Sequence, residues 1–83
     1  MDITICEDKK GGTARLTTES PASYYGIPIL RIEADDVNGD FGPADLLGDA
    51  NHVMLASQIV KGWAAQPGRT KAELEAARLF LHQ

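Results

Sequence analysis

Six carboxylates gather in one stretch of the chain, and their type and spacing are the strongest hint of chemistry in the sequence. Between Ile32 and Val60 there are six acids and no Lys or Arg: Glu33, Asp35, Asp36, Asp40, Asp45 and Asp49. The stretch carries −6 in a chain whose net charge is −4, so the rest of the chain is net positive. This segregation predicts either a solvated loop or a negative surface that binds a basic partner.

Part of this stretch also suggests a calcium site, because oxygen ligands at alternating positions suit a hard cation. The candidate ligands are Asp36, Asn38, Asp40 and Asp45. Counted from Asp36, an EF-hand loop needs Gly at its sixth position and Glu at its twelfth, where this chain has Phe41 and Leu47. Asx turns, in which Asp and Asn side chains bond to nearby backbone N–H groups, explain the same residues. We therefore predict neither a metal nor a cofactor.

Nucleophilic catalysis and phosphate binding lack a recognisable motif. Cys6 lies in a predicted strand with no helix N-terminus or cation beside it to activate the thiol, and His52 falls at a predicted helix start. The run Lys9 to Gly12 is not a phosphate-binding loop, because the spaced glycines and the following Lys-Ser/Thr are missing. The sequence predicts a protein that is not an enzyme, with a small metal- or thiol-dependent enzyme as the third hypothesis.

Length and composition predict a single domain over residues 1–83. The chain is 43% hydrophobic and 24% charged, which is typical of globular proteins. A single cysteine cannot form an internal disulfide and no leader segment is evident, so we expect a cytoplasmic protein. The longest apolar stretches, such as Val53 to Ala56, are far shorter than the roughly 20 residues that span a bilayer. The sequence pI of 4.9 argues against direct nucleic-acid binding.

The first half of the chain has the pattern of strands that position the acids. Apolar residues alternate over Asp2 to Cys6, and a glycine pair within Glu7 to Thr13 suits a hairpin turn. A second strand over Ala14 to Glu19 is predicted to end before Pro21. A third strand is predicted over Ile27 to Ala34, where β-branched residues are frequent.

The second half has the pattern of a loop and two helices. Asp35 to Asp49 is predicted to be an acidic loop, in which Pro43 to Leu47 suits a short helix stopped by Gly48. Asn51 is the predicted N-cap of a helix that extends to about Gln66. Thr70 followed by Glu73 is a capping box, which predicts the start of the last helix.

These elements predict an α+β fold: a three-stranded, mainly antiparallel sheet (β-β-β) covered on one face by two C-terminal helices, with a short helix possible in the acidic loop. Apolar spacing within the strands and helices identifies the core. The predicted core residues are Ile3, Ile5, Leu16, Leu30, Ile32, Ile59, Trp63, Leu74, Phe80 and Leu81.

Tyr24 and Tyr25 are adjacent, so their rings point to opposite sides if the backbone there is extended. Exposed Tyr is enriched at interfaces. We therefore add Tyr25 to the predicted partner-binding residues, alongside the six acids.

The combined features favour an interaction protein, either a monomer or a small homo-oligomer, whose acidic face binds a basic, nucleic-acid-binding surface of a partner protein. Closely spaced carboxylates can replace phosphates in a groove lined by Lys and Arg. In character alone the chain resembles the small acidic anti-restriction and anti-CRISPR inhibitors of phages, with which it shares no motif. The alternative is a DNA-binding regulatory module that uses the C-terminal helix pair, with Lys61, Arg69, Lys71 and Arg78 as its cations.

Overall fold

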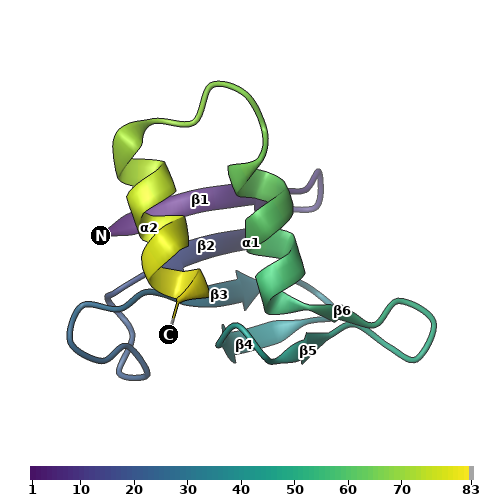
Figure 1. Cartoon of the computed structure of the whole chain (residues 1–83). Coiled ribbons are helices and arrows are strands. Elements are labelled where there is room, and N and C mark those ends of the chain that lie inside the picture. The colour runs from purple at the N-terminus through teal and green to yellow at the C-terminus, as the bar shows by residue number, and fades with distance from the viewer. Residues whose placement is uncertain (83) are drawn as a thin grey trace.

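Alternating apolar residues in the first half of the chain form a four-stranded antiparallel sheet. The computed structural model describes residues 1–82. The strands are β1 (Asp2–Glu7), β2 (Thr13–Thr17), β3 (Ile29–Glu33) and β4 (Asn38–Phe41), and they lie side by side in chain order. With the two helices that follow, the fold is α+β as predicted (Figure 1).

Strand β4 was not predicted and lies in the segment expected to be an acidic loop. Its residues have low strand propensity, but pairing with β3 supplies backbone partners from Leu30 opposite Phe41 to Glu33 opposite Asn38. The Ala34 N–H donates to the Val37 carbonyl oxygen at 3.0 Å, which closes a tight turn before β4. Tertiary pairing therefore overrides local preference here.

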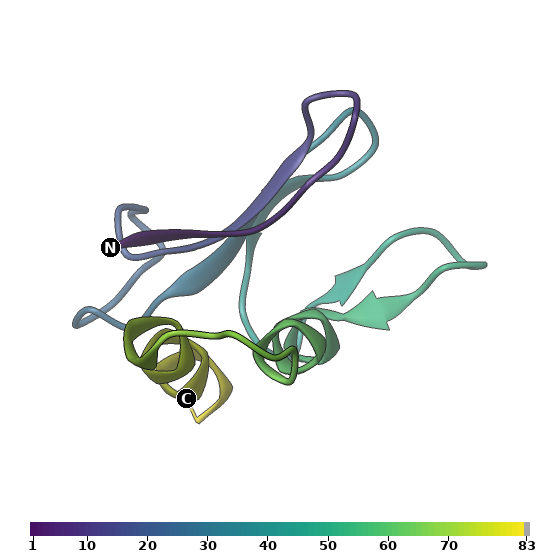
Figure 2. The ribbon, with the colours of Figure 1, turned by 90° about the horizontal axis from the view of Figure 1, so that it is seen from above.

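Two helices, α1 (Ala56–Ala64) and α2 (Lys71–Leu81), cover one face of the sheet (Figure 2). The helix-facing side chains of β2 and β3 alternate with outward-facing ones, as the period of two requires. Between sheet and helices lies one hydrophobic cluster, whose buried members are Ala14, Leu16, Leu30, Leu47, Ala56, Val60, Trp63, Ala76, Ala77 and Phe80.

The predicted core is confirmed at its centre and corrected at one helix position. Four predicted residues are buried, namely Leu16, Leu30, Trp63 and Phe80. Five more are partly buried against the cluster: Ile3, Ile5, Ile32, Ile59 and Leu81. Leu74 was predicted to be buried but is 46% exposed, because α2 turns its Ala76, Ala77 and Phe80 face toward the sheet instead.

A two-stranded arm replaces the predicted short helix after Pro43. Its strands are β5 (Leu46–Leu47) and β6 (Met54–Leu55), which pair antiparallel and project beyond the sheet (Figures 1 and 2). The carbonyl oxygens of Asp45 and Pro43 accept from the Ala56 and Ser57 N–H groups. The backbone after Pro43 is thus used to satisfy the start of α1, and it does not coil into a helix of its own.

The first helix begins four residues later than predicted, because its N-cap is residue 55 and not Asn51. Residues 54 and 55 are extended by their pairing in the arm, and the N-cap is Leu55, which makes no side-chain capping bond. The second helix begins as predicted. Thr70 accepts from the Glu73 N–H, and Glu73 accepts from the Thr70 N–H, so the capping box is complete.

Over residues 1–82, neither helix is long and apolar enough to cross a membrane.

Candidate interaction surface

The sheet face opposite the helices carries two of the predicted partner-binding acids, and both are held in ion pairs. Arg15 on β2 lies between Asp2 at 3.0 Å and Glu33 at 2.6 Å. On the next strands, Arg31 Nε donates to Asp40 at 2.9 Å. Both arginines lie outside the acidic stretch in the sequence. The fold brings them next to Glu33 and Asp40 and neutralises these two acids, which a count of charges along the sequence does not reveal.

Asp40 is the most firmly bound of the acids. The Arg31 guanidinium lowers the pKa of the Asp40 carboxyl below its ordinary value, and a hydrogen bond from the Ser20 hydroxyl lowers it further. Ser20 is buried and its Oγ lies 2.5 Å from Asp40 Oδ2, which ties the segment between β2 and β3 to β4. This acid therefore acts mainly as a structural link.

Asp45 and Asp49 are exposed and form local turns. Asp45 accepts from the Gly42 N–H at 2.5 Å. Asp49 accepts from the Asn51 N–H at 2.9 Å and lies 3.2 Å from His52 Nδ1. The Asn51 N–H and the His52 ring lower the pKa of Asp49. Asp49 forms an Asx turn, which was not predicted at this residue, whereas Asp45 bonds back to an N–H three residues earlier; both leave carboxylate surface facing solvent.

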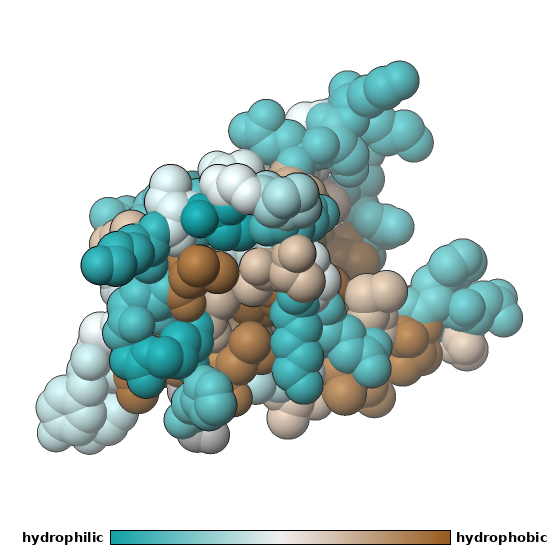
Figure 3. Space-filling model, turned by 45° about the horizontal axis from the view of Figure 1, so that its top comes forward, coloured by the Kyte–Doolittle hydropathy of each residue, from teal (hydrophilic) through white to brown (hydrophobic). Residues whose placement is uncertain are grey.

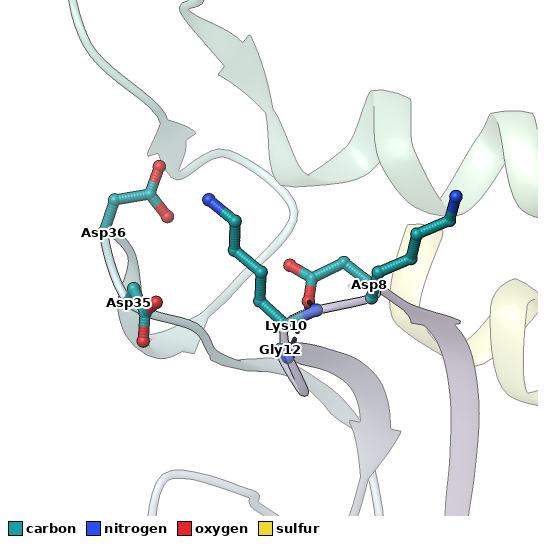
Figure 4. A pocket seen from close by; sticks show the side chains of 6 residues that line it. Asp8, Lys10, Gly12, Asp35 and Asp36 are labelled. Atoms are coloured by element: carbon teal, nitrogen blue, oxygen red, sulfur yellow. Dashed lines mark hydrogen bonds between the residues drawn. The ribbon is translucent and has the colours of Figure 1, made fainter.

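Asp35 and Asp36 differ from the other acids because neither side chain has a hydrogen-bond or ion-pair partner within residues 1–82. They form the turn between β3 and β4, which we call the acidic tip, and both are exposed. The β1–β2 turn lies beside the tip, and a hollow of about 410 Å³ separates the two (Figure 4). Asp8 and Lys10 face this hollow from the β1–β2 turn, and the Lys10 side chain extends toward Asp36.

Below the acidic tip lies an apolar recess between the sheet and the β5–β6 arm. Its two apolar hollows, of about 260 and 140 Å³, adjoin a third of about 400 Å³ whose lining is as polar as it is apolar. Their apolar lining includes Ile32, Ala34, Val37, Leu47, Met54 and Ile59. Figure 3 shows the brown surface set back between the projecting hairpin turns and the arm.

The recess was not predicted, because it joins residues that are distant in the sequence. The half-buried Ile32 and Ile59 were assigned to the core, whereas Val37 was assigned no role. One signal was present in the sequence, because the acidic stretch also contains large apolar residues, namely Leu46, Leu47, Val53 and Met54. In the structure, Leu46, Val53 and Met54 are exposed on the arm.

Tyr25 lies at the opposite end of β3 from the acidic tip, so the structure does not bring it together with Asp35 and Asp36. Tyr24 and Tyr25 are 67% and 87% exposed, and their ring centroids are 4.1 Å apart. A hydrogen bond to the Tyr25 side chain raises the pKa of Tyr24. The backbone at Tyr25 is left-handed, with φ of 54°, and the Ile27 N–H donates to the Tyr24 carbonyl oxygen. The tyrosines therefore project from a tight turn.

The residues of the alternative hypotheses, a metal or thiol enzyme and a DNA-binding helix pair, lie in separate parts of the molecule. Among residues 1–82 no three His, Cys, Asp or Glu side chains gather so as to hold a metal ion. Cys6 is exposed and lines the smallest hollow of the recess, whereas His52 lines the middle one. On the helix pair, Arg69 bonds to Glu73 and Arg78 bonds to Glu75, so two of the four candidate DNA-binding cations are already paired.

Comparison with known proteins finds no family model, no curated protein and no solved structure that matches this chain.

Proposed function

We propose that this protein is a small interaction protein whose acidic tip and the exposed acids near it bind a basic surface of a partner protein. The observation that carries the proposal is that the side chains of Asp35 and Asp36 are exposed and unpaired among the described residues. Glu33 and Asp40, in contrast, are already paired with arginines. Of the six acids in the acidic stretch, the two without a partner among the described residues therefore lie together, at the acidic tip.

The chemistry of the acidic tip favours an ionic partner. Asp45 and Asp49 also keep their carboxylates exposed, at 72% of the side-chain surface for Asp49. Opposite charges across an interface increase the rate of association and select the partner, although single rim pairs contribute only about 0–1 kcal/mol. Several carboxylates acting together are thus needed for useful affinity.

We further propose that the partner surface is one that binds nucleic acid, as the sequence analysis expects. A surface lined by Lys and Arg for phosphates has the charge that the acidic tip would complement. The protein would then act by competition, without any chemical step. Lys9 and Lys10 beside the tip reduce its net charge, so the contact would be made mainly by the Asp35 and Asp36 side of the hollow.

The test uses immobilised wild-type protein to capture partners from lysate, with elution by a step from about 50 to about 300 mM salt or by duplex DNA. The double variant Asp35→Asn/Asp36→Asn should fail to retain a partner that both salt and DNA release from the wild type. A control with the same change of net charge is Glu19→Gln/Glu75→Gln, at exposed acids outside the lining of the hollows, and it should behave as wild type. The proposal is wrong if the two double variants capture the same proteins, or if the purified protein itself shifts labelled DNA.

A further inference from the structure

We infer that the apolar recess is a docking groove for a segment of the partner in which large apolar side chains lie next to Arg or Lys. This inference rests on the proposed function, since it supplies the contact made beside the acidic tip. The groove would add an apolar contact to the ionic contacts made by the acidic tip.

The recess has an apolar floor that no part of the described chain covers. Ile32 and Ile59 are half-buried there, and Met54 is 46% exposed at the wall formed by the arm. The two apolar hollows, of about 260 and 140 Å³, are each smaller than the roughly 300–1,000 Å³ of sites that enclose a free ligand. Their size therefore suits the insertion of side chains from a larger partner.

The charge around the recess determines which partner fits. Carboxylates of Asp8, Asp36 and Asp49 line its three hollows. No Lys or Arg among the described residues lines them, and the one basic group, His52, already lies 3.2 Å from Asp49. An acidic rim around an apolar floor complements a segment that is apolar at its centre and basic at its flanks.

The arrangement matches the general anatomy of protein interfaces. Binding energy is concentrated in a central apolar anchor that becomes desolvated, and the polar rim excludes water and selects by charge. Here the floor residues would receive the anchor, and Asp36, which lines both the hollow at the tip and the two larger hollows of the recess, connects the rim to the floor.

The probes are three fluorescein-labelled peptides of about 12 residues. The first has two adjacent Leu flanked on both sides by Arg and Ser, the second has Ser in place of Leu, and the third has Glu in place of Arg. In fluorescence anisotropy, the first peptide should bind at least about tenfold more tightly than either of the others. Its binding should also slow the alkylation of Cys6, the chain's single cysteine, which lines the recess.

Two exposed apolar residues provide matched variants. Met54→Ser should weaken binding of the first peptide about tenfold, whereas Leu74→Ser should have no effect. Both side chains are 46% exposed in the native protein, but Leu74 lies on α2 and lines none of these hollows. Circular dichroism of both variants would confirm that they remain folded.

The outcomes separate this inference from the proposed function. If the Ser-substituted peptide binds as well as the Leu peptide and Asp35→Asn/Asp36→Asn weakens both, the acidic surface binds but the docking groove is wrong. If the Leu peptide binds but neither protects Cys6 nor responds to Met54→Ser, the groove is again wrong. If no peptide binds, the inference is overturned, and the capture experiment decides the proposed function independently.

Discussion

The helix-covered centre of the molecule and the end that bears the β5–β6 arm differ in how much of their apolar surface is buried. At the centre, Leu16, Leu30 and Phe80 are fully buried and fill the space between sheet and helices. At the end that bears the arm, Leu46, Val53 and Met54 remain exposed beside acids without partners. Burial of apolar area stabilises the centre, whereas the same residue types at the arm gain little from folding. The comparison indicates that the centre maintains the fold, whereas the apolar residues of the arm contribute little to it.

The largest effect should come from the centre, through Trp63→Ala. Trp63 is 4% exposed, and the Arg69 guanidinium lies 4.7 Å from its ring centroid. Removing a buried Trp should lower the free energy of unfolding by about 3–5 kcal/mol, which is comparable with the whole stability of a small domain. Chemical denaturation followed by circular dichroism measures this. Lys61→Ala, at an exposed position of the same helix, is the control, and an unchanged midpoint for Trp63→Ala would contradict the packing described.

A smaller effect should come from the outer face of the sheet, through Asp40→Asn. The Asp40 pKa is lowered chiefly by Arg31 and then by Ser20, so the ionised carboxylate stabilises the folded state. That contribution is complete above the unfolded pKa of about 3.9 and is lost as the pH falls through the lower folded pKa. The variant should be about 1 kcal/mol less stable at neutral pH, and its difference from wild type should shrink below about pH 4.

Denaturant midpoints measured from pH 7 to pH 3 would show this convergence. Asp36→Asn is the control, because the Asp36 side chain has no partner in residues 1–82. If Asp36→Asn lowers the stability as much as Asp40→Asn does, the contrast between paired and free acids is wrong.

The exposed tyrosine turn should gain stability on substitution. Tyr25 and Gly26 both have positive φ, at 54° and 74°, and are the central residues of a turn closed by the Ile27 N–H. This is the pattern of a type I′ turn, which favours Asn or Gly at the position of Tyr25. Tyr25→Asn should therefore raise the free energy of unfolding by about 0.5–1 kcal/mol.

A thermal melt should show the gain as a rise of a few degrees for Tyr25→Asn. The neighbouring Tyr24→Asn is the control and should show no gain, since Tyr24 does not have positive φ. A lower melting temperature for Tyr25→Asn would mean that the aromatic pair stabilises the turn by more than the backbone conformation costs.

Sequence reasoning succeeded where local signals agree with the tertiary structure. The alternation around Leu16 and Leu30 and the capping box at Thr70 each depend on neighbours within a few residues, and the structure confirms them. Strand β4 and the arm could not be predicted in the same way. Their residues are extended because backbone partners come from elsewhere in the chain: β3 pairs with β4, and the two strands of the arm pair with each other.

The candidate site shows the same limit. The acidic stretch was recognised from the sequence, and two of its acids, Asp35 and Asp36, are exposed in the structure. However, the charge count treated all six acids alike, because the cations that pair with Glu33 and Asp40 lie on strands preceding the stretch or bordering it. The apolar recess depends on contact between residues from β3, the arm and α1, which no local pattern encodes.

The smallest effect should come from the open end, through Leu46→Ser. Leu46 and Leu47 are consecutive residues of β5, but Leu46 is 63% exposed whereas Leu47 is buried in the core cluster. Successive side chains of a strand point to opposite sides, so Leu47 points into the core while Leu46 points to solvent. Substituting each of them therefore compares the core with the exposed side of the arm. Leu46→Ser should change the free energy of unfolding by no more than about 0.5 kcal/mol, whereas Leu47→Ser should cost at least about 2 kcal/mol. Denaturation of both variants under the same conditions measures the difference. Equal losses would mean that the arm is part of the stabilising core, and the recess would then be a packing defect of the fold and not a surface kept open for a partner.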